Sequence, residues 1–339
     1  INANNIYKSG NGSSASPYEI ETTASYEVTL TVNNGTGSGK VNVKEGNNAT
    51  FTVTPSSWYL AELETNACGG TLSGSTYTIS NVTSSKTCSI SFKKPTLYAK
   101  LLADKTERTV TTRPGGFSSV YTSDNTKTLY TSTENGTTVY YFAGNATDNW
   151  VKFGGFYWRI IRTNADGGIR LLYHGTSHDS TNAYISSSTA FNSSYNDSKY
   201  VGYMYDSNGT NSTIKNTIDT WYKNNLTNYT KYLSTTAIYC NARTGDGTYF
   251  GAYNRLYTKK EPKYDCTNTS DAFSVSNSSA KLTYPIGLMT ADEISFAGGL
   301  YENNAPAYYY RNSSSTSTSS TGSTYWWTMS PCLLYTSPS

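Results

Sequence analysis

The sequence has 339 residues, of which 36% are hydrophobic and only 14% are charged, and its formal net charge is +3. This small, scattered charge argues against a nucleic-acid-binding surface, and no run approaches the ~18 apolar residues of a membrane-spanning helix. The 32 tyrosines, with abundant Ser, Thr, Asn and Gly, are typical of a mainly β protein that is secreted or displayed on a cell surface.

Residues 1–25 are polar and predict a linker, with a short strand in SPYEIE. The chain opens without an initiator Met or a signal peptide. We therefore expect that a leader was removed or that the natural start lies further upstream.

A regular strand pattern begins at Tyr26. The stretch YEVTLTVN alternates apolar and polar residues, which predicts a half-buried strand. Further short strands are predicted in KVNVKEG, ATFTVTPSSWYLAEL, STYTISNVT and KTCSISFKK, with turn-rich segments between them. This spacing predicts a small all-β module over residues 26–94.

The module contains two cysteines, Cys68 and Cys88. A disulfide between them would close a short loop and stabilise the fold by about 3 kcal/mol. Two free buried thiols are the alternative, but the extracellular composition favours the disulfide.

The stretches TLTVNNGTGSG, FTVTPSSWYL and YTISNVTSSKTCSISF resemble the divergent internalin B-repeat family of bacterial surface proteins. The Trp that usually follows the glycine-rich turn of that family is not clearly present. The resemblance implies a spacer or adhesive stalk module rather than a catalyst.

A second domain is expected over residues 95–331. PTLYAKLLADK predicts a short helix, and TNADGG separates two apolar runs, Phe156–Arg162 and Ile169–Tyr173. Because Asp-Gly favours tight turns, these runs should pair as an antiparallel hairpin. A helix is predicted in NSTIKNTIDTWYKNNL, capped by Asn211, Ser212 or Thr213.

A last helix is predicted in LMTADEISFAGG. Thr290 is the expected N-cap, and Glu293 three residues later completes a capping box. Asp292 and Glu293 resemble a pair of catalytic carboxylates, but their place in the first helical turn explains them as partners of the cap and the helix dipole.

The stretches VKFGGFYWRIIRTNADGGIRLLYHG, STIKNTIDTWYKNNL, PIGLMTADEISFAGG and YWWTMSP resemble an extracellular domain family of gut Firmicutes. More distantly they are similar to the C-type lectin-like and formylglycine-generating-enzyme-like fold. The resemblance implies an α+β domain after the all-β module, so the whole chain should be mainly β with a smaller α component. IYKSGNGSSASPYEIE is similar to the segment that closes this family's domain, which implies a tandem array.

The last residues, Cys332 to Ser339, read CLLYTSPS. They resemble the translation of a sequencing-library transposase adapter, because the codons TGT CTC TTA TAC ACA TCT CCG AGC give these residues in order. An ordinary flexible tail is the alternative. We expect residues 332–339 to be an artefact that truncates the second domain, and the remaining cysteines to pair as Cys68–Cys88 and Cys240–Cys266.

The candidates for catalysis are few. His174 and His178, followed by Asp179, have a zinc-like spacing if helical. The stretch leaves a hairpin strand through Gly175 and is predicted to be a loop, so we expect no metal site. Cys240 and Cys266 lie upstream of LMTADEISFAGG, whereas the catalytic cysteines of formylglycine-generating enzymes lie downstream, so no catalytic role carries over. Two loop histidines also support no Ser-His-Asp set.

We therefore expect a non-enzymatic surface protein that binds a host or bacterial ligand, a glycan or a protein, without a cofactor. An enzyme on the formylglycine-generating-enzyme-like scaffold and a purely structural stalk are the alternatives. The ligand surface is expected in the polar loops 177–209 and 303–323, where aromatic side chains offer stacking faces. The candidate ligand-binding residues are Tyr184, Tyr195, Tyr308, Tyr309, Tyr310 and Trp327, although Trp327 also fits a strand core.

Overall fold

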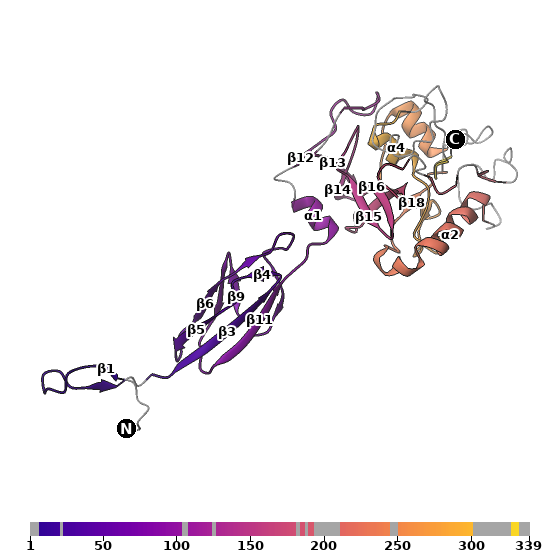
Figure 1. Cartoon of the computed structure of the whole chain (residues 1–339). Helices are drawn as coiled ribbons and strands as arrows, with labels where there is room; N and C mark the ends of the chain where they lie inside the picture. Colours follow the sequence, from indigo (N-terminus) through magenta and orange to yellow (C-terminus); the bar gives the residue numbers. More distant parts are fainter. Residues whose placement is uncertain are drawn as a thin grey trace. The chain divides into compact units, whose positions relative to one another are not determined.

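The computed structural model divides the chain into two compact units, Ile1–Lys100 and Leu101–Ser339 (Figure 1). It describes residues 7–20, 23–103, 108–123, 127–180, 184–186, 189–192, 211–244, 250–300 and 327–331. The division falls within helix α1 (Leu97–Ala103), a few residues beyond the boundary expected after residue 94. Strands outnumber helices in both units, so the expected mainly β character is confirmed.

The N-terminal unit consists of short strands. A hairpin of β1 (Tyr7–Ser9) and β2 (Glu19–Ile20) precedes a four-stranded sheet in the order β5–β3–β11–β8 and a three-stranded sheet in the order β6–β10–β9. Their bounds are β3 Ser25–Asn33, β5 Gly39–Lys44, β6 Ala49–Thr52, β8 Leu63–Asn66, β9 Thr71–Ser73, β10 Thr76–Ile79 and β11 Lys86–Phe92. A further short pair joins β4 (Gly35–Thr36) to β7 (Thr54–Pro55).

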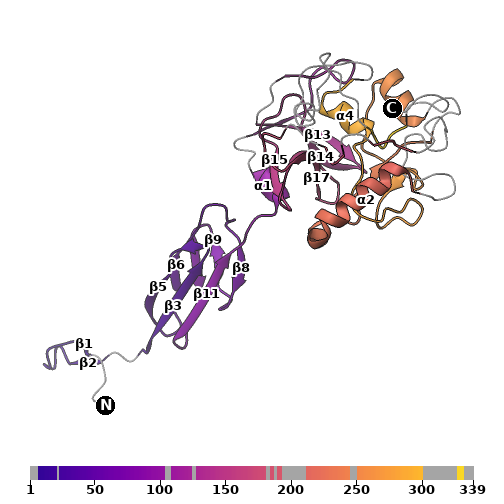
Figure 2. The same ribbon diagram turned by 45° about the vertical axis from the view of Figure 1, so that its right-hand side comes forward.

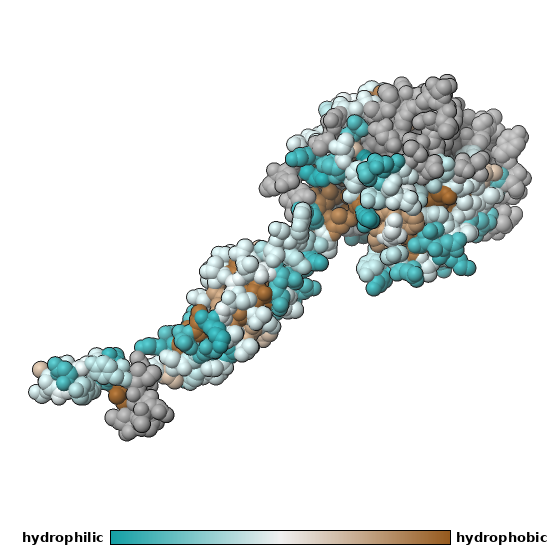
Figure 3. Space-filling model, viewed as in Figure 1, coloured by the Kyte–Doolittle hydropathy of each residue, from teal (hydrophilic) through white to brown (hydrophobic). Residues whose placement is uncertain are grey.

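The two central strands of the four-stranded sheet, β3 and β11, lie side by side and are parallel, although they are its first and last strands in chain order (Figure 2). The alternation predicted for β3 is confirmed, because Val28, Leu30 and Val32 are buried. On β11, Ile90 and Phe92 join them in one core cluster. The face of this unit that Figure 3 shows is mostly pale or teal with smaller brown areas, as expected for a module whose apolar side chains face inward.

The C-terminal unit is built on a six-stranded sheet in the order β12–β13–β14–β16–β15, with β17 added to β16. The bounds are β12 Thr109–Thr111, β13 Thr128–Glu134, β14 Thr137–Tyr141, β15 Trp150–Phe153, β16 Phe156–Thr163 and β17 Ile169–Gly175. The predicted hairpin is confirmed as β16 and β17, joined by a turn in which Asn164 N donates to Gly168 O at 2.8 Å. The other edge of β16 is shared, since β15 pairs with its start and β14 with its end.

Short helices pack on this sheet. Helix α2 (Thr213–Asn225) is capped by Ser212, whose Oγ accepts from Lys215 N, which selects one of the caps the sequence left open. The remaining elements are η3 Thr227–Tyr232, β18 Tyr239–Cys240, α3 Gly251–Tyr253, η4 Asn254–Lys259, β19 Ala272–Phe273 and α4 Ala291–Ala297. Within the described ranges, no helix combines the length and apolar character needed to cross a membrane.

Both predicted disulfides are confirmed. The Cα atoms of Cys68 and Cys88 are 5.5 Å apart, and those of Cys240 and Cys266 are 5.8 Å apart. Both separations lie in the normal range for a disulfide. Cys332 lies outside the described residues.

Candidate functional site

The start of α4 forms the predicted capping box. Thr290 Oγ1 accepts a hydrogen bond from Glu293 N at 3.1 Å, and Glu293 Oε2 accepts one from Thr290 N at 3.0 Å. Because the cap engages only one carboxylate oxygen, the other is directed into the interior of the unit. Glu293 is almost fully buried, with 1% of its surface exposed.

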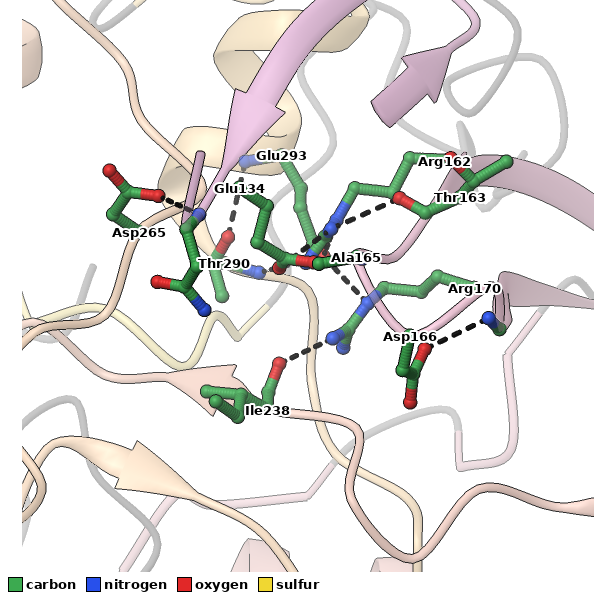
Figure 4. A network of polar contacts seen from close by, with 12 residues as sticks. Glu134, Arg162, Thr163, Ala165, Asp166, Arg170, Ile238, Asp265, Thr290 and Glu293 are labelled. Atoms are coloured by element: carbon green, nitrogen blue, oxygen red, sulfur yellow. Dashed lines mark hydrogen bonds and ion pairs between the residues drawn. The ribbon is translucent and has the colours of Figure 1, made fainter. Parts of the chain in front are cut away.

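Two arginines of the β16–β17 hairpin meet this second oxygen (Figure 4). Arg162 Nε lies 3.2 Å and Arg170 Nε 2.9 Å from Glu293 Oε1. Arg162 also pairs with Glu134 at the end of β13, at 2.9 Å. We call Glu134, Arg162, Arg170 and Glu293 the ionic network, and it joins α4 to three strands of the sheet.

Two aromatic rings pack against the arginines of the ionic network. The guanidinium of Arg162 lies 4.3 Å from the ring centroid of Tyr264, and that of Arg170 lies 4.3 Å from the ring centroid of Tyr239. Burial by itself would raise the pKa of Glu293, but the charges of Arg170 and Arg162 outweigh it and hold this pKa below its ordinary value. A carboxylate held ionised in this way is a poor proton acceptor, so the ionic network fits a structural role better than acid–base catalysis.

The neighbouring carboxylate, Asp292, is also held in place. Arg255 donates to it through Nε at 2.9 Å and through Nη2 at 2.5 Å, and Lys263 N donates to it at 2.9 Å. Such a bidentate pair fixes direction as well as distance. Asp292 therefore ties the segment around η4 to the start of α4.

The two histidines do not converge on one point. His174 is buried, and its Nε2 lies 2.8 Å from the backbone oxygen of His178. The side chain of His178 is exposed and lies 3.0 Å from Asp179 Oδ1. Among the residues that the structure describes, no three His, Cys, Asp or Glu side chains are grouped as metal ligands.

The stability of the C-terminal unit should depend on the charge of His174. Burial is the largest cause that lowers the pKa of His174 below its ordinary value, and the nearby charge of Arg159 adds to it. The unfolded chain therefore binds this proton more readily, so stability present above pH ~6.5 should be lost as the pH falls from there toward the lower pKa of the folded state.

Thermal unfolding between pH 7.5 and 5 measures this loss. His174→Gln should flatten the dependence over this window. His178→Gln should keep most of it, because burial, the largest cause, is unchanged and the hydrogen bond to His174 comes from the backbone oxygen of residue 178. An unchanged slope in His174→Gln would contradict the assignment.

A group of aromatic side chains lies where the β15–β16 hairpin meets α2 and η3. Gly154 and Gly155 form the turn, with φ angles of 62° and 86° that few other residues adopt. The turn sets Phe153 directly opposite Phe156. Because paired residues point to the same side of a sheet, both rings face the helices.

These rings form two contacting groups that pack on one hydrophobic cluster. Phe153 meets Tyr229 at 5.4 Å and Tyr232 at 6.4 Å between ring centroids. Phe156 meets Tyr173 at 5.6 Å and Trp221 at 5.4 Å. We call this set the aromatic rim: Phe153, Phe156, Tyr173, Trp221, Tyr229 and Tyr232.

The aromatic rim packs on a buried cluster and is exposed mainly at Tyr232. Trp158, Tyr222 and Leu226 are buried below it. The rim side chains are half-buried except Tyr232, which is 65% exposed. The ammonium of Lys231 lies 4.9 Å from the ring centroid of Tyr232 and is the charged group closest to that ring among the described contacts.

The structure places the predicted ligand-binding residues in different settings. Trp327 is half-buried, donates from Nε1 to Thr189 O at 2.8 Å, and packs against Phe191 in a core cluster. This packing matches the core part of the alternative, although residue 327 is not in a strand. Tyr184 is half-buried. The others, Tyr195, Tyr308, Tyr309 and Tyr310, lie outside the described residues.

Sequence reasoning did not single out the aromatic rim as a site. Its members are spread over the hairpin, α2 and η3, and each looked like an ordinary strand or helix residue. The usable signal was the Phe-Gly-Gly-Phe stretch, residues 153–156, because a two-residue glycine turn must place its flanking rings opposite each other.

No protein-family model, curated protein or solved structure matches the chain. The function is therefore argued from the geometry of the described residues.

Proposed function

We propose that the chain is a non-enzymatic binding protein of the bacterial cell surface, whose C-terminal unit holds a glycan or protein ligand against the aromatic rim. The observation that carries this proposal is the gathering of these rings around one hydrophobic cluster, with Tyr232 65% exposed beside Phe153. In this proposal the N-terminal unit is a B-repeat-like spacer and the C-terminal unit has a lectin-like fold.

The aromatic rim has the properties of a recognition surface. Tyr and Trp combine a broad apolar face with a polar tip, so they contact a ligand at little cost in side-chain entropy. The rings are fixed by a glycine turn on one side and by buried Tyr222 and Leu226 on the other. A rigid surface loses less entropy when a ligand binds.

The buried charged groups support a binding role over a catalytic one. Glu293 and Glu134 are engaged by arginines, and Asp292 is held by Arg255 and a backbone N–H. Each of these groups is thus committed to joining elements of the fold. The two disulfides are compatible with a location outside the cytoplasm.

Removing the exposed ring tests the site. A glycan and mucin screen on the full-length chain first identifies a ligand, and Tyr232→Ala should then weaken its binding about tenfold, or about 1.4 kcal/mol. Tyr257→Ala is the matched control, because Tyr257 is also exposed, at 42%, and has a lysine ammonium 5.1 Å from its ring.

The outcomes separate the two candidate surfaces. Equal loss in Tyr232→Ala and Tyr257→Ala would speak against a localised site. If alanine at Tyr308, Tyr309 and Tyr310 abolished binding while Tyr232→Ala retained it, the ligand would bind the loop expected from the sequence instead of the aromatic rim.

A further inference from the structure

A single tryptophan of the N-terminal unit occupies a backbone conformation that its residue type disfavours. Ser56 to Tyr59 form a turn in which Tyr59 N donates to Ser56 O at 3.1 Å. Trp58 is the third residue of this turn and has a φ of 74°. Turns with a positive φ at this position normally carry Gly or Asn there. A bulky residue in this region is strained, and such strain gathers at functional sites.

Burial of the side chain does not offset this strain. Trp58 is 75% exposed, more than the other large hydrophobic side chains among the described residues. The neighbouring residues hold the turn instead: Ser56 N donates to Asn34 O at 2.9 Å, and Tyr59 packs against the core of the unit. The indole is therefore displayed to solvent on a turn that other groups fix in place.

One lysine ammonium lies near the indole, and a second lies near the ring of Tyr59. The ammonium of Lys100 lies 5.0 Å from the centroid of the Trp58 ring, and that of Lys94 lies 5.6 Å from the ring of Tyr59. Both distances are within the range of a cation–π contact. The next lysine, Lys93, is paired with Glu62 at 3.7 Å. Two neighbouring aromatic rings thus each have a lysine ammonium within cation–π distance.

We propose that Trp58, Tyr59, Lys94 and Lys100 form a binding site for an anionic saccharide, a sugar that carries a carboxylate or a sulfate. The C–H face of a pyranose ring stacks on the exposed indole, and the ammonium groups form charge-assisted hydrogen bonds to the anionic substituent. The site belongs to the N-terminal unit and does not depend on the aromatic rim.

Charge distinguishes this ligand from a single-stranded nucleic acid, which also pairs stacking with positive charge. A nucleic-acid groove needs basic residues that follow a long backbone. Here the net charge of the chain is only +3, and the two ammonium groups at these rings both come from residues 94–100. One sugar ring with one or two anionic groups matches this extent.

The test uses the full-length chain and a chondroitin sulfate hexasaccharide, measured by isothermal titration calorimetry. Wild type should bind it at least tenfold more tightly than the desulfated, carboxyl-reduced hexasaccharide. Trp58→Ala and Trp58→Gly should each weaken binding at least tenfold. Lys100→Gln should weaken binding of the anionic probe only. Tyr18→Ala is the matched control, because Tyr18 is 70% exposed in the same unit and should keep full affinity.

Trp58→Gly separates binding from folding. Because glycine adopts a positive φ without strain, this variant should unfold at a temperature at least as high as Trp58→Ala while lacking the ring. The proposal is overturned if wild type does not prefer the anionic hexasaccharide, or if Trp58→Gly binds like wild type. Binding to phosphatidylglycerol vesicles or to oligo-deoxythymidine, without binding to the saccharide, would also overturn it.

Discussion

Glu293→Gln should lower the free energy of unfolding of the C-terminal unit by about 3–5 kcal/mol, the range found when one partner of a buried ion pair is removed. The variant keeps the shape of the side chain and its capping contact with Thr290 but removes the charge. Arg162 retains Glu134, whereas Arg170 is left with the Ile238 backbone oxygen and the Tyr239 ring. The side chain of Arg170 is only 6% exposed, so water cannot replace the lost partner.

Urea unfolding of the full-length chain measures this loss, with hydrogen exchange in α4 to assign it to the C-terminal unit. Asp179→Asn is the control, because Asp179 pairs with His178 but is 80% exposed. Exposed pairs contribute about 0–1 kcal/mol. A loss below ~1 kcal/mol in Glu293→Gln would show that the ionic network does not hold α4 to the sheet.

A second substitution separates the effect of the unpaired charge on Arg170 from the effect of its hydrogen bond to the Ile238 backbone oxygen. Combining Glu293→Gln with Arg170→Met removes the cation that has lost its partner and leaves an apolar side chain against Tyr239. Buried ion pairs replaced as a whole often cost little stability. The double variant should therefore be more stable than Glu293→Gln alone. If it were less stable, the hydrogen bond from Arg170 to the Ile238 backbone oxygen would be the main contribution.

The ionic network shows where local sequence patterns stop being informative. The capping box was predictable, since Thr290 and Glu293 are three residues apart and interact within one helical turn. The partners of Glu293 were not, because Arg162 and Arg170 lie on a hairpin far upstream. That hairpin was itself predictable from its Asp-Gly turn, but nothing in the sequence indicates which helix it contacts.

The N-terminal unit shows the same division. The alternation in residues 26–33 was enough to predict β3 and its buried face. The parallel pairing of β3 with β11 was not predictable, because a parallel pair has no turn to set its register. The disulfides were predictable because each cysteine had a neighbour close in sequence. The aromatic rim and the turn of Trp58 depend on backbone angles and long-range contacts, which composition does not reveal.

Removing the disulfide of the N-terminal unit should cause the second large loss of stability, this time in the N-terminal unit itself. Replacing Cys68 and Cys88 together with Ala removes a crosslink that closes a loop with a sequence separation of 20. In the chain-entropy model this costs about 3 kcal/mol. Cys88 lies in the core, 2% exposed, and Ala avoids burying a new polar group there. Small domains often have only about 5 kcal/mol in total, so most of the margin of this unit should be lost.

The matched comparison is the Cys240→Ala, Cys266→Ala pair, whose sequence separation of 26 gives nearly the same entropy term. Because the C-terminal unit also has the ionic network and a larger core, this pair should stay folded at 37 °C. The variant in which Cys68 and Cys88 are both replaced with Ala should instead show fast hydrogen exchange in β3 and β11 at that temperature. Dithiothreitol should produce the same change in the wild-type chain. Protection of β3 and β11 that is equal with and without the disulfide would mean that the two sheets are stable without the crosslink.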